Sequence, residues 1–255
     1  MKTHTQTLLA VAAMTCSGYA ATTLTNQVLV NFGGSISGND YTLGSGEVDT
    51  TGTFTGFGSP VVSSGEADLT GGSTHQGFNF DPTSLGSLTS QNWVVETRVS
   101  FDAFNTGQRT ILDVNGDTDF RINNGGSLLE MVYWDGGQLG SQTTALPGTG
   151  EFVHIAMVWD AAASSLTGYV DGVAIGTIDN NAFATPDANN VSFGYFGRNG
   201  FDNRGIDGQL DSVAFSTFTG SFDANTDFQI AAVPEPSTSM LVGLSGMLVL
   251  LRRRR

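Results

Sequence analysis

The strongest constraint on the fold of this chain is a period of two in its apolar residues. Residues 92–101 show it best, because apolar side chains and a threonine stand on one face and charged or hydroxyl groups on the other. The first face is Trp93, Val95, Thr97, Val99 and Phe101, and the second includes Glu96, Arg98 and Ser100. Such alternation is typical of a β-strand that packs one face on a core.

Similar short runs recur along the chain, separated by Gly, Asn, Asp and Ser. We predict further strands at residues 110–114, 118–122, 128–133, 152–159, 166–170, 173–178, 191–196 and 210–218. The run 152–159 is apolar on both faces and therefore predicts a central strand. Asn115-Gly116 and Asp171-Gly172 predict tight hairpins, whose central residues need positive φ. Many short strands with turns at this spacing predict an all-β, two-sheet antiparallel jelly-roll sandwich.

Four segments resemble laminin G-like, concanavalin A-like jelly-roll domains. Residues 150–160 (GEFVHIAMVWD) resemble the family's W-x-H-V-A-x-x-x-D strand, and residues 166–173 (LTGYVDGV) its L-x-L-Y-V-D-G hairpin. Residues 193–199 (FGYFGRN) and 206–215 (IDGQLDSVAF) follow in family order. Phe152 replaces the usual tryptophan and Ala214 the usual basic residue. The resemblance implies a jelly roll with glycan or protein binding, but no single function.

The end of the chain has the composition of a sorting signal. Pro234-Glu235-Pro236 precedes an apolar run, 240–251, and four arginines, 252–255. The run is shorter than the roughly 20 residues of a membrane span, and the arginines favour the cytoplasmic side. Residues 233–255 resemble the PEP-CTERM signal of Gram-negative bacteria, which implies exosortase as a partner and transient membrane contact. A simple C-terminal anchor is the alternative, and both predict export.

The beginning of the chain predicts a signal peptide over residues 1–21. Basic residues precede the apolar stretch 8–14, and small residues follow it. Cleavage there would remove Cys16, the only cysteine, so the mature protein would have no disulfide, thiol nucleophile or thiolate metal site. Acylation of Cys16 is the alternative, although the residues before it make a poor lipobox.

Processing at both ends would leave residues 22–232, which we predict to be one jelly-roll domain. They contain 23 acidic residues against five arginines and no lysine, hence a net charge of −18. Such a surface repels nucleic acid and anionic membranes, so we expect no nucleic-acid partner. It attracts cations, among which calcium is the obvious extracellular one. Solubility of a secreted protein is the alternative explanation of the charge.

Two segments combine an aromatic ring with carboxylate or amide groups, as sugar-binding loops do. A ring can stack on the apolar face of a sugar while neighbouring polar groups bind its hydroxyls. The ligand-binding residues that we predict on this ground are Trp134, Asp135, Asn199, Phe201 and Asp202. The alternative is that the rings are core residues, as most aromatic residues of a sandwich are.

Asp211 is the predicted metal ligand. Alternation assigns it to the face of Val213 and Phe215, which should be the core side, and a carboxylate there needs donors or a cation. Similarity to calcium-binding jelly rolls implies one structural Ca²⁺ here, with oxygen ligands that suit this ion. Satisfaction by backbone N–H groups is the alternative. The Asp and Asn residues of 113–119 alternate in a way that suggests a calcium-binding loop, but the segment lacks the glycine and glutamate that an EF-hand needs. We therefore interpret these residues as the tip of a hairpin.

No catalytic set is recognisable in the sequence. Glu66-Ala67-Asp68 has an E-x-D pattern, but Gly71 stands where jelly-roll glycosidases have a third carboxylate. His154 lies in the most apolar run and is predicted to be packed and hydrogen-bonded, whereas His75 is predicted to be exposed. We therefore predict a protein that is not an enzyme, with a polysaccharide hydrolase or lyase as the least favoured alternative.

Together these features predict an exported, exosortase-sorted binding module of the cell surface or extracellular polymer matrix of a Gram-negative bacterium. A polysaccharide is the expected ligand. The alternative is a structural or adhesive matrix protein whose molecules associate with the help of calcium.

Overall fold

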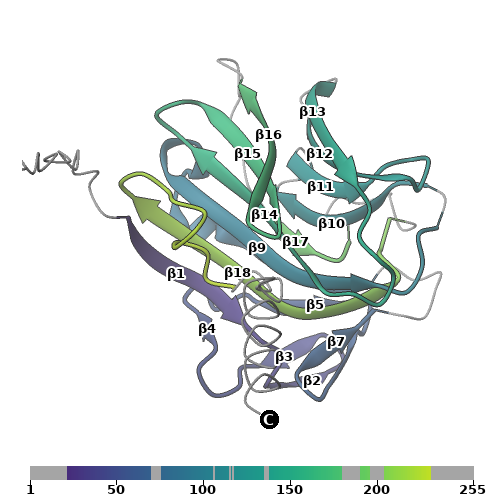
Figure 1. The fold of residues 1–255 in the computed structure, drawn as a ribbon. Coiled ribbons are helices and arrows are strands. Elements are labelled where there is room, and N and C mark those ends of the chain that lie inside the picture. The colour runs from purple at the N-terminus through teal and green to yellow at the C-terminus, as the bar shows by residue number, and fades with distance from the viewer. Residues whose placement is uncertain are drawn as a thin grey trace, which may run out of the picture.

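The chain folds into two antiparallel β-sheets packed face to face (Figure 1). The computed structural model describes residues 22–69, 76–105, 107–114, 116, 118–134, 138–179, 190–195 and 204–230, and all structural statements concern these residues. Besides the strands they form two short 3-10 helices, η1 (Pro82–Leu85) and η2 (Leu88–Ser90). The predicted all-β sandwich is therefore confirmed.

The larger sheet, called sheet A here, has the order β16-β15-β14-β9-β18-β1-β4, and β7 pairs with both β18 and β6 beside this row. Its strands are β1 (Thr23–Val30), β4 (Val48–Asp49), β6 (Val61–Ser63), β7 (Glu66–Asp68), β9 (Asn92–Phe101), β14 (Val153–Asp160), β15 (Ser165–Val170), β16 (Val173–Asp179) and β18 (Gly208–Thr219). Strand β14 lies between β15 and β9 and is buried from Val153 to Trp159, which confirms the predicted central strand.

The second sheet, called sheet C, has the order β13-β12-β11-β10-β17-β8-β5. Its strands are β5 (Thr55–Phe57), β8 (Gly77–Phe80), β10 (Arg109–Val114), β11 (Thr118–Ile122), β12 (Leu128–Trp134), β13 (Gln138–Ala145) and β17 (Val191–Phe193). The separate hairpin of β2 (Ser35–Ser37) and β3 (Asp40–Thr42) packs on the core through Ile36 and Tyr41.

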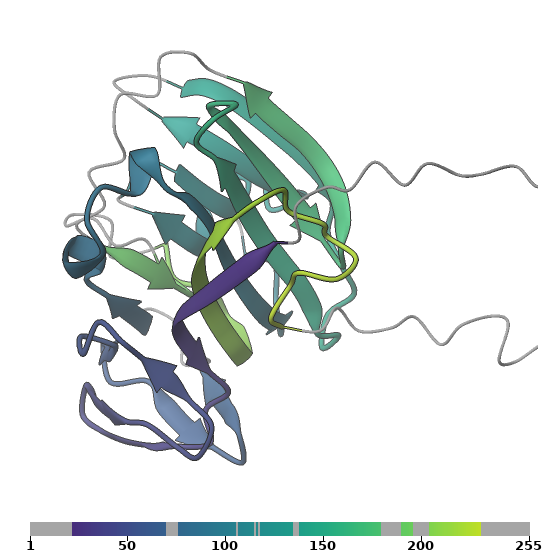
Figure 2. The same ribbon diagram turned by 90° about the vertical axis from the view of Figure 1, so that its left-hand side faces the viewer.

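The core fills the space between sheets A and C, which Figure 2 shows edge-on. Its largest fully buried side chains include Trp93, Trp159, Phe80, Phe120 and Phe215. Strand β9 supplies Trp93, Val95, Val99 and Phe101 to this core, so the predicted inner face of that strand is correct. A core of this size accounts for a stable sandwich without any disulfide, because apolar burial is the main stabilising term.

The predicted tight turn is present at Asp171-Gly172. Asp171 and Gly172 both have positive φ, 49° and 77°, and Val170 pairs directly with Val173, as in a two-residue hairpin. Strands β10 and β11 are also paired, with Val114 opposite Thr118, and Gly116 between them has a φ of 72°. Asn115 lies outside the described residues, and three residues rather than two separate this pair. The strands of the N-terminal third and β13 were not predicted.

After β18 the chain crosses the outer face of sheet A, the face turned away from sheet C (Figure 2). We call residues 221–230 the strap. Phe222 and Phe228 of the strap pack on a small apolar cluster of Val94, Val158 and Phe218, which is separate from the main core. The outer face of sheet A is thus partly covered by the protein's own chain.

Candidate functional site

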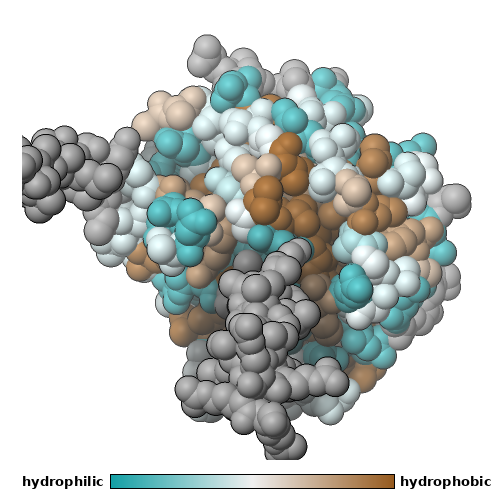
Figure 3. Space-filling model, viewed as in Figure 1, coloured by the Kyte–Doolittle hydropathy of each residue, from teal (hydrophilic) through white to brown (hydrophobic). Residues whose placement is uncertain are grey.

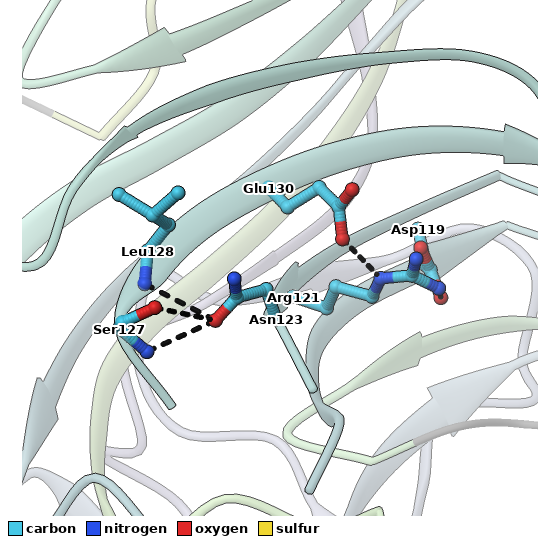
Figure 4. A network of polar contacts seen from close by, with 6 residues as sticks. All are labelled: Asp119, Arg121, Asn123, Ser127, Leu128 and Glu130. Carbon is cyan, nitrogen blue, oxygen red and sulfur yellow. Dashed lines mark hydrogen bonds and ion pairs between the residues drawn. The ribbon is translucent and has the colours of Figure 1, made fainter. Parts of the chain in front are cut away.

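The outer face of sheet C carries a charged row on two neighbouring strands. Asp119 and Arg121 of β11 alternate with core residues, and Glu130 of β12 lies directly opposite Arg121 (Figure 4). The Arg121 Nε donates to Glu130 Oε2 at 3.0 Å, and its Nη1 lies 3.5 Å from Asp119 Oδ2. One guanidinium therefore joins two carboxylates across the two strands.

This row is little exposed to solvent. Asp119 and Arg121 are 5% and 6% exposed, and the Asp119 Oδ1 has no hydrogen-bond partner among the described residues. Burial raises the pKa of Asp119 to about 6, because desolvation outweighs the favourable charges of Arg121 and Arg204. The row consequently links β11 to β12, and its little-exposed carboxylates are poorly placed to meet a bulky ligand directly.

The turn between β11 and β12 sets the register of this row. The Asn123 side chain accepts hydrogen bonds from the backbone N–H groups of Ser127 and Leu128, at 2.9 and 3.2 Å (Figure 4). Such local side-chain bonds favour a turn over continued strand. They hold Ile122 opposite Leu129 and hence Arg121 opposite Glu130.

Trp134 ends β12 on the same outer face. It is 44% exposed, whereas the preceding Tyr133 is 1% exposed in the core, so the two rings point to opposite sides of sheet C. Glu130 and Val132 precede Trp134 on that face, and Gln138 of β13 pairs with it. The alternative that this ring is a core residue is wrong for Trp134.

The other predicted ligand-binding residues, Asp135, Asn199, Phe201 and Asp202, lie outside the described residues. So do His75 and the sorting motif Pro234-Glu235-Pro236. Their predicted roles stay predictions, and the structure places Trp134 alone of the predicted ligand-binding set.

Asp211 does not lie on the core face that side-chain alternation predicts for it. The register of β18 against β9 shifts between Leu210 and Ser212, so Asp211 is the extra residue of a β-bulge. Its side chain is 30% exposed and forms a 3.1 Å ion pair with Arg98 Nη1 instead of facing the core. The Ser212 hydroxyl donates to the same carboxylate oxygen. Among the described residues, the partners of the Asp211 carboxylate are therefore side chains and not backbone N–H groups.

The calcium expectation at Asp211 remains a prediction. Among the described residues, no group of three or more His, Cys, Asp or Glu side chains is close enough to hold a metal ion. Asp113, from the other acidic segment, is fully buried and accepts a 3.2 Å hydrogen bond from the Gly116 N–H. That contact agrees with the interpretation of this segment as a hairpin tip.

His154 is packed and hydrogen-bonded, as predicted. It is fully buried on the outer face of sheet A, and its Nε2 lies 3.1 Å from Glu96 Oε2. Glu96 itself was expected on the polar face of β9 but is also fully buried, because the strap covers it. Sequence reasoning missed this pair and the Asp119–Arg121–Glu130 row, since both depend on which strands become neighbours.

An open groove of about 490 Å³ lies at one end of sheet A. Paired strands bring Thr23 opposite Thr219 and Thr25 opposite Thr217, and five of the nine lining residues carry hydroxyl groups. Phe218 is the one aromatic residue in this lining and is 6% exposed. The groove can hydrogen-bond a ligand, but among its lining residues it lacks an exposed ring for stacking.

Among the residues that the structure describes, no helix is long and apolar enough to cross a bilayer.

Fold and surface together define a jelly-roll protein: two antiparallel sheets, an outer face on sheet A that the strap partly covers, and an exposed ring on sheet C. The chain belongs to the concanavalin A-like lectin/glucanases superfamily, whose family model matches residues 72–221. The PEP-CTERM protein-sorting motif matches residues 232–255. That motif indicates an exported protein, anchored at or passing through the cell envelope, and implies processing by exosortase.

Solved structures share the fold at low sequence identity. Trypanosoma rangeli sialidase in complex with sialic acid matches with a TM-score of 0.57 and 12% identity, over 78% of this chain and 31% of that chain. Botulinum neurotoxin type C, whose cell entry depends on two ganglioside molecules, matches with 0.50 and 12%, over 78% and 48%. This chain therefore spans about half or less of these proteins. No curated protein matches it.

Proposed function

We propose that this exported protein is a non-catalytic carbohydrate-binding module of the cell surface or extracellular polymer matrix. The observation that carries the proposal is the exposed Trp134 ring on the outer face of sheet C, next to polar groups of β12 and β13. Rigid aromatic side chains on a β-sheet can stack on sugar rings without losing much side-chain entropy. Membership of a lectin-like superfamily agrees with this role.

The structural relatives support a sugar as the ligand class. Sialic acid is bound to the sialidase relative, and gangliosides are needed by the neurotoxin relative. The net charge of −18 over residues 22–232 makes strongly anionic polymers unfavourable partners for this chain. We therefore expect neutral polysaccharides to bind more tightly than polyuronic acids.

The charged row supports a binding role over a catalytic one. A glycosidase needs two carboxylates that flank the scissile bond, one of them able to donate a proton. Here Asp119 and Glu130 both bind Arg121, and this cation stands between them. We expect no product release from any polysaccharide that binds.

The test is a binding assay with the purified full chain in a detergent that lacks a sugar headgroup. Neutral and acidic polysaccharides are titrated in calcium and in EDTA, and soluble products are analysed in parallel. We expect saturable binding that Trp134→Ala weakens at least tenfold, or about 1.4 kcal/mol. Val173→Ala, which truncates another exposed apolar residue on sheet A, is the matched control. Equal binding by Trp134→Ala and the native protein would exclude this ring from the binding site.

The acidic surface favours a second candidate, a structural matrix protein that associates through calcium. Like-charged molecules repel until divalent cations neutralise them. This candidate predicts calcium-dependent self-association in light scattering, reversed by EDTA, and no preference among glycans. The Trp134→Ala variant would associate like the native protein.

A further inference from the structure

The strap is held on sheet A by one buried carboxylate. The backbone N–H of Gln229 donates to Glu96 Oε1, and that of Ile230 to Glu96 Oε2, both at 3.1 Å. His154 Nε2 lies 3.1 Å from the same Oε2. Glu96 and His154 are both fully buried, so the carboxylate depends on these partners for the hydrogen bonds that water would otherwise supply.

The sheet is shaped for this contact. Glu96 pairs with Ala156 on one side and with Ala214 on the other, and both alanines are fully buried. Small side chains beside Glu96 let the strap backbone come within hydrogen-bond distance of the carboxylate. Neither neighbouring strand thus obstructs the strap at this point.

Aromatic packing holds the rest of the strap. The Phe228 ring lies 4.7 Å from the His154 ring and 5.3 Å from Tyr169, and Phe222 lies 5.1 Å from Phe228. Burial, together with the nearby Asp223, raises the pKa of Tyr169, so the phenol beneath the strap stays neutral. Figure 3, in the orientation of Figure 1, shows apolar residues gathered in the middle of this side of the molecule.

The strap occupies the interval between the two matched parts of the chain. The superfamily match ends at residue 221, and the sorting motif begins at 232. Pro234 follows Ile230 by four residues, which span at most about 14 Å when extended. Ile230 is 6% exposed and its N–H is already engaged. While the strap is docked, chain length alone limits how far the start of the Pro-Glu-Pro motif can lie from Ile230.

We propose that the strap must leave sheet A before exosortase can process the tail, with Glu96 as the positioning residue that holds it docked. The inference rests on the sorting motif at 232–255. Exosortase breaks one peptide bond; the acyl side passes to water or to an acceptor amine or hydroxyl, and the new amine leaves with the arginine-rich end. Proteins that bind a peptide through its backbone take it extended over several residues, which docking at Gln229 and Ile230 prevents.

Processing of the full chain in a host that contains its exosortase tests this inference. Glu96→Gln keeps the side-chain size but removes the charge. Phe222→Ala removes packing of the strap and leaves every strand residue of sheet A unchanged. Loss of the tail is followed by pulse-chase for both variants, for native protein and for Val173→Ala as control. We expect both strap variants to be processed roughly fivefold faster, because weakening the docking by about 1 kcal/mol raises the released population by that factor. Equal or slower processing would overturn the proposal.

Two further measurements separate the possible failures. Amide hydrogen exchange on the purified full chain should show Gln229 and Ile230 protected in native protein and exposed in both variants; unprotected native amides would also refute docking. The same pulse-chase in a host without exosortase should leave the tail intact. If native protein keeps its tail in both hosts, the sorting assignment fails, and the strap proposal fails with it. If native protein loses its tail only in the host with exosortase, and both variants are processed at the native rate, the sorting assignment stands and the strap proposal fails.

Discussion

The outer faces of the two sheets each bury a carboxylate, but they do so in different ways. On sheet A, Glu96 binds two backbone N–H groups of the strap and His154. On sheet C, Asp119 contacts Arg121, while its Oδ1 has no partner among the described residues. The first arrangement covers part of a face with the protein's own chain, and the second leaves Trp134 exposed beside it. The difference indicates which face is available for a ligand.

Among the charged groups of the two outer faces, removing the Glu96 carboxylate should destabilise the protein strongly. Glu96→Ala leaves two backbone N–H groups and His154 without their acceptor under the strap. We expect a loss of about 3 kcal/mol, because each orphaned buried donor costs about 1–3 kcal/mol and part of that is recovered by strap release. Urea unfolding measures it, with the exposed Glu151→Ala as control. A loss below about 0.5 kcal/mol would contradict a tightly docked strap.

The Asp119 carboxylate should make stability depend on pH. Its folded-state pKa is raised from 3.8 to about 6, so the folded protein binds this proton more tightly than the unfolded chain does. Its contribution to stability is therefore full below about pH 4 and is lost as the pH rises through 6. The full difference corresponds to about 3 kcal/mol.

Asp119→Asn removes this titration while Glu130 still pairs with Arg121. Relative to native protein, the variant should gain stability steadily between pH 4 and pH 7. Urea unfolding at each pH gives the difference. Parallel stability curves for the two proteins would show that Asp119 ionises normally.

Breaking the exposed ion pair at the β-bulge should matter less. Asp211 and Arg98 are both about 30% exposed, so Asp211→Asn should cost less than about 1 kcal/mol in thermal unfolding. The same variant tests the calcium prediction. If this carboxylate binds calcium, the ion should raise the melting temperature of native protein and leave that of Asp211→Asn unchanged.

Trp134→Ala should change stability least while changing ligand binding most. The ring is 44% exposed, so its loss should cost less than about 0.5 kcal/mol. Tyr133→Ala, one residue earlier but fully packed, should cost about 3–5 kcal/mol. Similar destabilisation by both substitutions would mean that Trp134 is a packing residue and that the face of sheet C is not open.

The parts that could be predicted are those governed by local pattern. Strands β9 and β11 have the predicted bounds, and Asp171-Gly172 forms the predicted turn, because side-chain alternation and positive φ are properties of a few consecutive residues. Asp211 was assigned to the wrong face because one extra residue in a strand reverses alternation, and a bulge is visible only when the partner strand is known. Ala214 looked like an unexplained departure until its place beside Glu96 was known.

The sequence by itself determined the all-β sandwich, the central strand, the packed His154 and the sorting tail, since these follow from periodicity, composition and short motifs. Only the tertiary structure decided what the two outer faces do. Glu96 and Gln229 are 133 residues apart in the chain, and their contact exists because the strap returns across sheet A. Arg121 reaches Glu130 through the register of two strands, and Trp134 is exposed because Tyr133 takes the core side. Burial and pairing between distant segments come from chain folding as a whole, which local patterns do not encode.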